Sequence, residues 1–279
     1  MPASSSSAMK QPVDVAPENS FEPPVPVLPI LGLPVHDLGW NHALALLEKK
    51  LVSRHGFTHI AFLNANNANV MVADPEYRDV LSRCLVLPDG IGVDVAAHFL
   101  HGGRFTANLN GTDFVPAALT FISTPLRVGL LGATSEVLQT AAANFRKHTP
   151  WHEFVEISDG YFDRADPETI LARIEKARID LMLVAMGTPL QEKWVDRHLT
   201  ADHARVVISV GALLDFVSGR VSRAPHWIRR MRSEWLYRLW LEPSRLWRRY
   251  VLGIPVFLTH VLFHRLRQPK SPLAGGQTG

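Results

Sequence analysis

Hydrophobic residues in the middle of this chain recur with two alternating periods. Short apolar runs, often β-branched, are typical of buried strands, and an apolar residue every three or four positions is typical of an amphipathic helix. Strands are predicted at 58–63, 85–87, 127–131, 153–157, 181–186 and 206–210, and helices at 38–54, 68–83, 112–122, 135–148, 167–178 and 189–199. Asp37 is expected to cap the first helix. The alternation predicts an α/β fold, with a Rossmann-like, mostly parallel sheet and helices on both faces.

Changes in composition divide the chain into four parts. Residues 1–27 hold a serine run and six prolines, and are expected to be a disordered tail. Residues 28–218 carry the strand–helix alternation and form the predicted α/β domain. Residues 219–268 are basic and rich in tryptophan, and are expected to form a helical appendage. Residues 269–279 are expected to be a second disordered tail.

Charge is distributed unevenly between these parts. Residues 219–268 contain eleven arginines, no lysine and two glutamates, a net charge of +9, whereas the rest of the chain carries −6. One guanidinium group can bind two phosphate oxygens at once, and tryptophan and tyrosine favour the headgroup level of a bilayer. The appendage is therefore expected to meet an anionic membrane surface. No apolar window reaches the ~18–20 residues needed to span one.

Two other functions would use similar features. A nucleic-acid-binding protein could use the same arginines and tryptophans on phosphates and bases. The absence of lysine and the apolar run at 250–263 favour a lipid surface instead, so nucleic acid is not an expected partner. A nucleotide-binding oxidoreductase would have a similar sheet, but the chain lacks the complete G-x-G-x-x-G fingerprint.

The loops after the predicted strands are the candidate positions for ligand binding and catalysis, because ligands of parallel sheets bind beyond the carboxyl ends of the strands. These loops are 64–67, 88–93, 132–135, 158–161, 187–191 and 211–215. All but the first contain a glycine, which lets a diphosphate approach the backbone. Gly132 lies in a segment that resembles a nucleotide loop, although a plain tight turn explains it equally well.

Two of these loops carry side chains suited to a sugar nucleotide. Asp89, between a proline and Gly90, is a candidate general base for an attacking hydroxyl, or alternatively the cap of the next helix. Asn64 and Asn66 belong to an asparagine cluster whose amides suit sugar hydroxyls and uracil edges. Helix capping and turn formation are the alternative explanation for most of that cluster.

Two further loops add an amide and two carboxylates. Gln191 and Glu192 follow Gly187 on the first turn of a predicted helix, where a phosphate or sugar would meet them. Asp215 follows Gly211 in an otherwise apolar run, so it needs a hydrogen-bond partner or a ligand.

Metal and thiol chemistry are not expected. His98 and His101 share a helix face but have no acidic or cysteine partner at zinc spacing. No D-x-D cluster is present to hold a divalent cation against a nucleotide diphosphate. Cys84 lies in an apolar run and is expected to be a small buried side chain.

An ordered set of motifs resembles one family. The motifs are F-L-N-A-N-N-A-N (62–69), L-P-D-G-I-G-V (87–93), N-G-T-D-F (110–114), S-D-G-Y-F (158–162), M-G-T-P-L-Q-E-K-W (186–194), V-G-A-L-L-D-F-V-S-G (210–219), R-A-P-H-W (223–227) and the E-W-L-Y-R-L segment with its arginine-rich continuation. Together they resemble the WecG/TagA/CpsF family of glycosyltransferases, family 26. The resemblance runs from about residue 28 to 250.

The resemblance implies an inverting, metal-independent transfer without a cofactor. A sugar would move from a UDP-sugar to a polyprenyl-diphosphate-linked saccharide, in exopolysaccharide, capsule or other surface-glycan synthesis. The enzyme would be a hexosyl-, N-acetylhexosaminyl- or uronosyltransferase, attached peripherally to the cytoplasmic face of the cell membrane. Relatives suggest self-association, so a homo-oligomer is a possible state.

The resemblance also implies roles for individual residues. Asp89 would be the catalytic base, Asn64 a donor-sugar contact, and Gln191 a holder of sugar or phosphate. Three appendage arginines would reach the diphosphate: Arg238, Arg245 and Arg248, which share about one helical face if Pro243 only bends the segment. The expected substrate-binding residues are Asn66, Gly90, Gly111, Asp113, Gly132, Gly187, Glu192, Gly211, Asp215 and Arg223.

One position departs from the family pattern. Where relatives usually have T-x-N, this chain has Phe62-Leu63-Asn64, so a hydroxyl is missing. Either the donor sugar differs, or a neighbour such as Asn66 replaces that contact. The sequence does not name the sugar.

Overall fold

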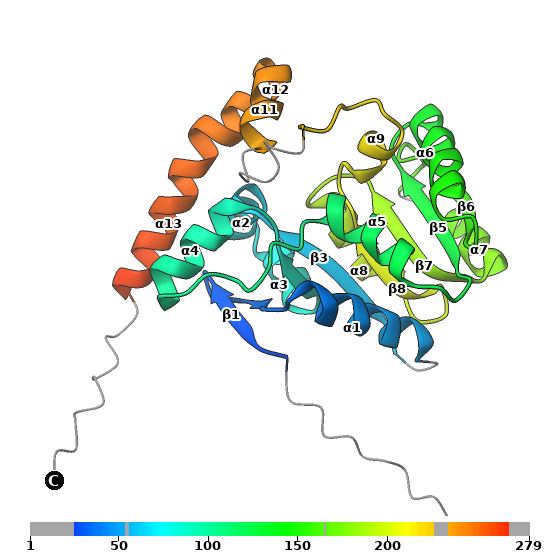
Figure 1. The fold of residues 1–279 in the computed structure, drawn as a ribbon, viewed down its shortest axis with the longest axis horizontal. Helices are drawn as coiled ribbons and strands as arrows, with labels where there is room; N and C mark the ends of the chain where they lie inside the picture. Colours follow the sequence, from blue (N-terminus) through cyan, green and yellow to red (C-terminus); the bar gives the residue numbers. More distant parts are fainter. Residues whose placement is uncertain (1–24, 54–55, 165, 226–233, 268–279) are drawn as a thin grey trace, which may run out of the picture.

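The computed structural model describes residues 25–53, 56–164, 166–225 and 234–267. Its centre is a six-stranded sheet in the order β4–β3–β8–β7–β5–β6, and every neighbouring pair is parallel (Figure 1). The strands are β3 (Thr58–Leu63), β4 (Leu85–Pro88), β5 (Arg127–Gly132), β6 (Glu153–Ser158), β7 (Ile179–Ala185) and β8 (Ala204–Ser209). All six correspond to strands predicted from the hydrophobic runs, which confirms the α/β fold.

Alternate residues of each strand enter different hydrophobic cores. On β3, Ile60 and Phe62 join one core, while Ala61 and Leu63 join another. The first core is covered by α1 (Trp40–Val52), α5 (Gly111–Phe121), α6 (Ser135–His148) and α9 (Leu213–Val217). The opposite face is covered by α2 (Ala65–Ala73), α3 (Pro75–Ser82), α4 (Ile91–His101), α7 (Glu168–Ala177) and α8 (Leu190–His198). Helices therefore cover both faces, as a buried parallel sheet requires.

The N-terminal part of the domain contains elements that the sequence pattern did not predict. A hairpin of β1 (Val27–Ile30) and β2 (Leu33–His36) turns at Leu31 and Gly32, both with positive φ. The expected helix cap at Asp37 is wrong, because its carboxylate accepts a hydrogen bond from the Thr106 backbone at 2.7 Å and the helix begins after Gly39.

The helix predicted over 68–83 is two helices in the structure. The chain leaves helical geometry at Asp74, whose side chain caps α3 by accepting from the Tyr77 amide at 3.1 Å. Pro75 then occupies the first position of α3, where its missing N–H costs nothing. The break lets α2 and α3 take different directions on the same face of the sheet.

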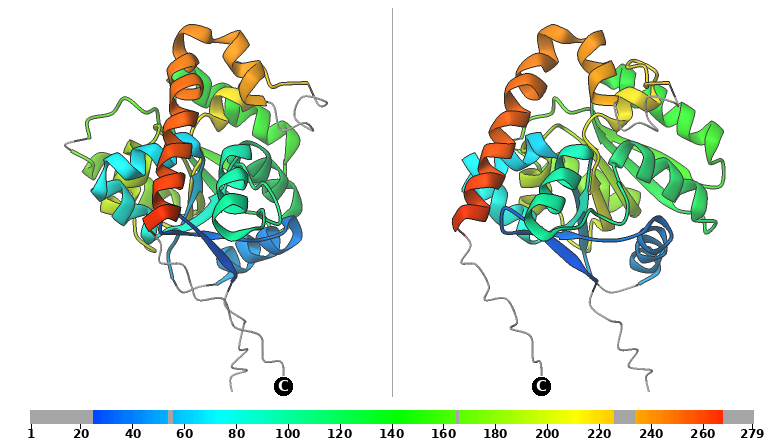
Figure 2. Two further views of the ribbon diagram at one scale, coloured as in Figure 1. Left: turned by 90° about the vertical axis from the view of Figure 1, so that its left-hand side faces the viewer. Right: turned by 60° about the vertical axis from the view of Figure 1, so that its left-hand side comes forward.

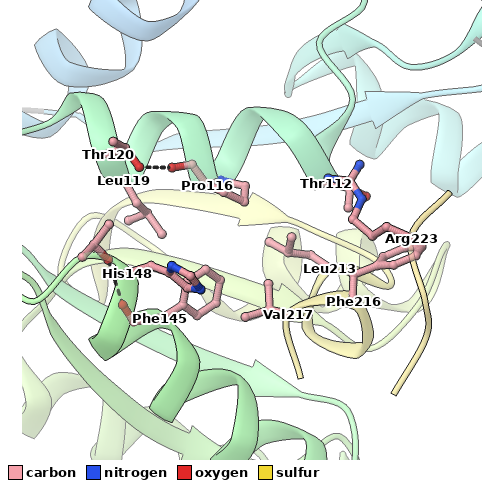
Figure 3. Close-up of a pocket in the computed structure, with 11 residues that line it drawn as sticks. Thr112, Pro116, Leu119, Thr120, Phe145, His148, Leu213, Phe216, Val217 and Arg223 are labelled. Carbon is pink, nitrogen blue, oxygen red and sulfur yellow. Dashed lines mark hydrogen bonds between the residues drawn. The ribbon is translucent and has the colours of Figure 1, made fainter. Parts of the chain in front are cut away.

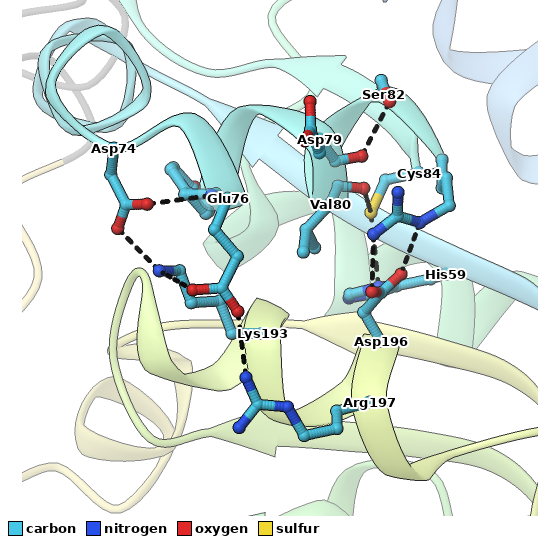
Figure 4. A network of polar contacts seen from close by, with 12 residues as sticks. His59, Asp74, Glu76, Asp79, Val80, Ser82, Cys84, Lys193, Asp196 and Arg197 are labelled. Carbon is cyan, nitrogen blue, oxygen red and sulfur yellow. Dashed lines mark hydrogen bonds and ion pairs between the residues drawn. The ribbon is translucent and has the colours of Figure 1, made fainter.

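A network of ion pairs connects α8 to α3 and its flanking residues (Figure 4). Lys193 contacts Asp74 at 2.7 Å and Glu76 at 2.8 Å, and Arg83 binds Asp196 through two hydrogen bonds. The pairs are partly to largely exposed and each contributes little alone, so their value lies in connecting α8 along its length to residues 74–83.

Beneath the network, a polar chain runs through the core. His59 lies between the Cys84 thiol at 3.3 Å and the Ser209 hydroxyl at 2.9 Å. Burial lowers the pKa of His59 to about 4 and raises that of Cys84, so both are neutral near pH 7. This arrangement agrees with the expectation of a buried, unreactive cysteine.

The C-terminal segment contains α11 (Glu234–Leu241), α12 (Pro243–Trp247), a π-helical turn η1 (Arg248–Leu252) and α13 (Gly253–Arg267). The last helix lies against α2 and α4 (Figure 2). Phe257 and Val261 of α13 are buried in the same core as the hairpin and β3, and Asn69 donates to the Gly253 carbonyl at 2.7 Å. The end of the appendage thus shares a core with the α/β domain. No helix in the described part of the chain is long and apolar enough to cross a bilayer.

Gly132 occupies a position that admits no side chain. Its φ is +120°, and a Cβ there would lie 2.3 Å from the Ala185 carbonyl oxygen. We therefore expect Gly132→Ala to destabilise the fold by about 2 kcal/mol or more, a fall in Tm of at least roughly 4 °C in a thermal melt. Gly103→Ala, with no atom within 4 Å of its Cβ, is the control. Equal melting of both variants would contradict this packing.

Candidate active site

A cleft of about 490 Å³ opens beyond the carboxyl ends of β4, β3, β8 and β7. Loops after all four strands contribute, and the start of the π-helical turn closes one side. The lining residues are Phe62, Asn64, Asn66, Asn67, Asp89, Gly111, Thr112, Ala185, Gly187, Thr188, Gln191, Glu192, Ser209, Val210, Gly211, Ala212, Asp215, Phe216, Leu246 and Arg249.

Asp89 and Asn64 meet in this cleft. The Asn64 Nδ2 donates to Asp89 Oδ2 at 3.0 Å, and the Asp89 backbone N–H donates to the Leu63 carbonyl at 2.9 Å. Asn64 Oδ1 also accepts from the Asn67 amide, which caps α2. Both interpretations of Asn64 are therefore compatible, since one side chain caps the helix and orients the carboxylate. A carboxylate so held at the cleft can accept a proton from a bound hydroxyl.

A second polar group occupies the start of α8. Gln191 Oε1 accepts from the Gly187 amide at 3.2 Å, and its Nε2 donates to Glu192 Oε1 at 2.8 Å. The Thr188 hydroxyl donates to the same glutamate oxygen at 3.0 Å. These bonds fix which end of the Gln191 amide is the donor. The orientation in which the Gln191 amide would meet a ligand is therefore fixed by these bonds.

Glu192 is almost completely buried, with 1% of its surface exposed. Burial raises the pKa of its carboxyl, and the hydrogen bonds from Gln191 and Thr188 only partly offset that effect. Its second oxygen has no hydrogen-bond partner among the described residues. Glu192 forms part of the cleft wall, next to Gln191.

Asp215, which belongs to α9, also lines the cleft. Gly211, with φ of +56°, lies four residues before it and also lines the cleft. An Arg220 guanidinium nitrogen is 3.9 Å from Asp215 Oδ1, a distance that leaves room for a competing polar ligand.

The appendage contributes Leu246 and Arg249 to the cleft. Arg249 Nε is buried without a hydrogen-bond partner among the described residues. Arg248 is exposed and its guanidinium lies 5.5 Å from the Trp247 ring, so it is not part of the cleft wall. The side chains of Arg238 and Arg245 lie outside the described part of the structure, and their predicted roles stay predictions.

The predicted common face for the three arginines depended on an uninterrupted helix. The structure breaks that helix at Glu242, where the backbone is not helical, and inserts a π-helical turn from Arg248. A π turn adds a residue to the helical repeat and rotates all side chains that follow. Arg249, the second residue of this turn, lines the cleft.

Four predicted substrate-binding residues do not line the cleft. Arg223 forms an ion pair with Asp113 at 2.8 Å. Gly90 donates its amide to Asn108 Oδ1 at 2.8 Å, and Gly132 approaches the Ala185 backbone. The loops at 132–135 and 158–161 lie above β5 and β6, where Ser135 and Asp159 bind each other at 2.5 Å. The nucleotide-like Gly132 loop is thus outside the cleft.

An apolar cavity of about 420 Å³ adjoins the cleft between α5, α6 and α9 (Figure 3). It shares Thr112 and Phe216 with the cleft, and Arg223 lies at one end. Pro116, Leu119, Phe145, Leu213 and Val217 form most of its wall. Thr112 and Phe216 thus lie between the polar cleft and this more apolar cavity.

Several cleft residues were not predicted from the sequence. Thr112 and Thr188 lie inside the quoted motifs, so their hydroxyls were available as candidates. Ser209 ends an apolar strand, and no sequence signal distinguished it. Among the described residues, no group of three or more histidine, cysteine, aspartate or glutamate side chains could hold a metal ion.

Comparison with known proteins gives a consistent assignment. A sequence model described as "Glycosyl transferase WecG/TagA/CpsF family" matches residues 28–271. A Bacillus subtilis protein named N-acetylglucosaminyldiphosphoundecaprenol N-acetyl-beta-D-mannosaminyltransferase is 33% identical over 218 residues, 77% of this chain and 83% of that protein. Proteins of the same name from Bacillus spizizenii and Staphylococcus aureus are 29% and 30% identical, covering 88% and 72% of this chain and 95% and 82% of their own lengths.

The environment of Glu192 generates a pH-dependent prediction. Because the folded-state pKa lies above the ordinary 4.5, the folded protein holds this proton to higher pH than the unfolded chain. The stabilisation is complete below about pH 4.5 and is lost as the pH rises through the folded-state pKa. Glu192→Gln keeps the acceptor oxygen but cannot ionise, so its Tm relative to the unmodified protein should rise between about pH 4 and 8. A difference in Tm that does not change with pH would contradict a raised pKa.

Proposed function

Because this chain belongs to the WecG/TagA/CpsF family of glycosyltransferases, we propose that it moves a sugar from a UDP-sugar to a polyprenyl-diphosphate-linked saccharide with inversion at the anomeric carbon. The observation that carries the proposal is the convergence of Asp89, Asn64 and Arg249 on one cleft at the carboxyl end of the sheet. A carboxylate and a guanidinium in the same cleft provide a base for the acceptor and a partner for the leaving diphosphate.

The acceptor class follows from the names of the relatives. Those proteins are named for an acceptor made of N-acetylglucosamine on undecaprenyl diphosphate, and for transfer of N-acetylmannosamine. We extend only the polyprenyl-diphosphate link to this chain. Phe62 lines the cleft where relatives usually have a threonine, and its ring packs against Phe114 and fills the space above Gly111. The donor pocket therefore has a different surface at this point, and the sugar transferred is left open.

The proposed reaction is a single displacement. Asp89 takes the proton of the acceptor hydroxyl as that oxygen bonds to the anomeric carbon. The bond from this carbon to the diphosphate oxygen breaks, and its electron pair leaves with UDP. Asn64 keeps the carboxylate oriented through its 3.0 Å hydrogen bond. Arg249, which lines the cleft, stabilises the charge on the departing diphosphate in this scheme.

The appendage has a second part in the proposal. A lipid-linked acceptor is confined to the membrane, so the enzyme must work at its surface. We assign this attachment to the aromatic and basic residues of the appendage, at the cytoplasmic face. The same segment that supplies Arg249 to the cleft would then bring the cleft to the lipid.

The two alternative functions have no supporting observation in the structure. The family match spans the α/β domain and the appendage together, so it explains the sheet and the basic segment at once. The loop most like a dinucleotide loop, at Gly132, is outside the cleft.

Replacing the proposed base should stop the chemistry without unfolding the protein. We expect Asp89→Asn to lower kcat by about 10²-fold or more, because general base catalysis is typically worth that much. UDP release in the presence of a polyprenyl-diphosphate acceptor, screened over UDP-hexoses, UDP-N-acetylhexosamines and UDP-uronates, is the assay. Asp159→Asn, in the loop outside the cleft, is the matched control. Transfer at the unmodified rate by Asp89→Asn would show that another group is the base.

Adjacent arginines of the π turn provide a second test. We expect Arg249→Ala to lose about 10²–10³-fold in kcat, because a donor to the developing diphosphate charge is removed. Arg248→Ala, whose side chain is exposed beside Trp247, should keep most of its activity. The reverse order of effects would refute the position assigned to Arg249.

A further inference from the structure

Helix α4 has an apolar face that the described residues cover only in part. Its inner face buries Val93, Ala96 and Ala97 in the core. On the outside, an apolar stripe recurs every four residues and remains about two-fifths exposed: Ile91, Val95 and Phe99. Surface helices of globular proteins ordinarily carry polar residues there. The outer side of α4 is therefore largely apolar, with His98 and His101 as its exposed polar side chains, and it suits a second apolar environment.

The stripe borders α13. A Cβ on Gly92 would lie 3.9 Å from the Phe257 ring, near the start of both helices. Near their ends, the Arg265 guanidinium lies 4.8 Å from the Phe99 ring centre. The two helices therefore run parallel and side by side (Figures 1 and 2). On α13 the exposed apolar residues are Val256, Leu258, Leu262, Phe263 and Leu266.

The charges on these two helices have one sign. All residues of α4 and α13 are described, and α13 contains no acidic residue. The only acid of α4, Asp94, is buried. Arg265 and Arg267 are exposed at the end of α13. An exposed apolar face edged by cations and without exposed carboxylates is complementary to anionic lipid.

A second copy of the chain is the less suitable occupant. In a twofold interface the same patch supplies both sides, so Arg265 and Arg267 would have to pair with groups of that patch. No exposed carboxylate on α4 or α13 would compensate them. An anionic bilayer satisfies the apolar and the cationic groups together.

The position of α4 connects this face to the cleft. The helix begins at Ile91, two residues after Asp89. Asp89 lines the cleft, and Ile91 starts the exposed stripe. Contact between the stripe and the headgroup layer would fix the height of the carboxylate above the membrane.

We propose that α4 and α13 together form a docking face for an anionic bilayer, and that Ile91, Val95 and Phe99 of the α/β domain enter the interface. The surface is thus larger than the appendage alone. The link to catalysis rests on the proposed function, whereas the binding of vesicles does not.

The test is cosedimentation of the full-length protein with phosphatidylcholine vesicles that contain phosphatidylglycerol. Val95→Glu should weaken the partition coefficient at least about fivefold, since a like charge near an anionic surface costs about 1 kcal/mol. Leu262→Glu on α13 should act similarly. Val52→Glu, an equally apolar exposed site at the end of α1, should bind as the unmodified protein does.

Each other outcome has a defined meaning. Unchanged vesicle binding by Val95→Glu overturns the proposal, and so does an unmodified protein that does not bind the vesicles. Light scattering that shows a dimer split by Val95→Glu, with vesicle binding unchanged, assigns the face to a second copy and also overturns it.

Activity separates this proposal from the proposed function. Transfer to a short-chain, water-soluble acceptor should be the same in Val95→Glu and the unmodified protein. An equal loss on soluble and vesicle-borne acceptors would place Val95 in the chemistry and overturn the docking role. If no sugar is transferred by any form, yet Val95→Glu still weakens vesicle binding, the proposed function fails and the docking face stands.

Discussion

The burial of Phe257 and Val261 against α2 and α4 determines where the appendage lies. These two side chains contribute on the order of 2 kcal/mol each when fully buried, enough to fix a short helix onto a domain. The hydrogen bond from Asn69 to the Gly253 carbonyl sets the start of that helix. Because Arg249 lies four residues before Gly253, this packing also sets the guanidinium over the cleft. The basic segment thereby becomes part of the site.

The cleft itself is chemically asymmetric. Asp89 is held at the cleft by Asn64 at the end of a strand, whereas burial raises the pKa of Glu192 and favours its protonated form. In the proposed mechanism Asp89 accepts a proton, whereas Glu192 holds the Gln191 amide. The ion pairs of Lys193 with Asp74 and Glu76 keep the start of α8 in place for that second group.

Much of the fold was predictable because the hydrophobic period agreed with the burial. The strand at 58–63 and the helix at 135–148 have their predicted bounds. No bounds were predicted for α4, since its Ile91, Val95 and Phe99 stripe removes the polar face that marks a surface helix. The hairpin at 27–36 was missed because it turns on the positive φ of Leu31 and Gly32, which a hydrophobic pattern does not encode.

The site was predictable at its sheet edge but not at the appendage. Four of the six candidate loops meet in the cleft, because parallel strands bring their carboxyl ends together. The loops above β5 and β6 do not, since the strand order places them at the far edge. Arg248 was named from the family resemblance, and its common face with Arg238 and Arg245 assumed a continuous helix, which the break at Glu242 and the π turn interrupt.

A crystal structure with UDP bound tests the central claim most directly, because it locates the diphosphate relative to the appendage. The account predicts the diphosphate within hydrogen-bonding distance of Arg249, with the nucleoside toward Asp215. A nucleotide held instead by the Gly132 loop above β5 and β6, away from Asp89 and Arg249, would contradict it.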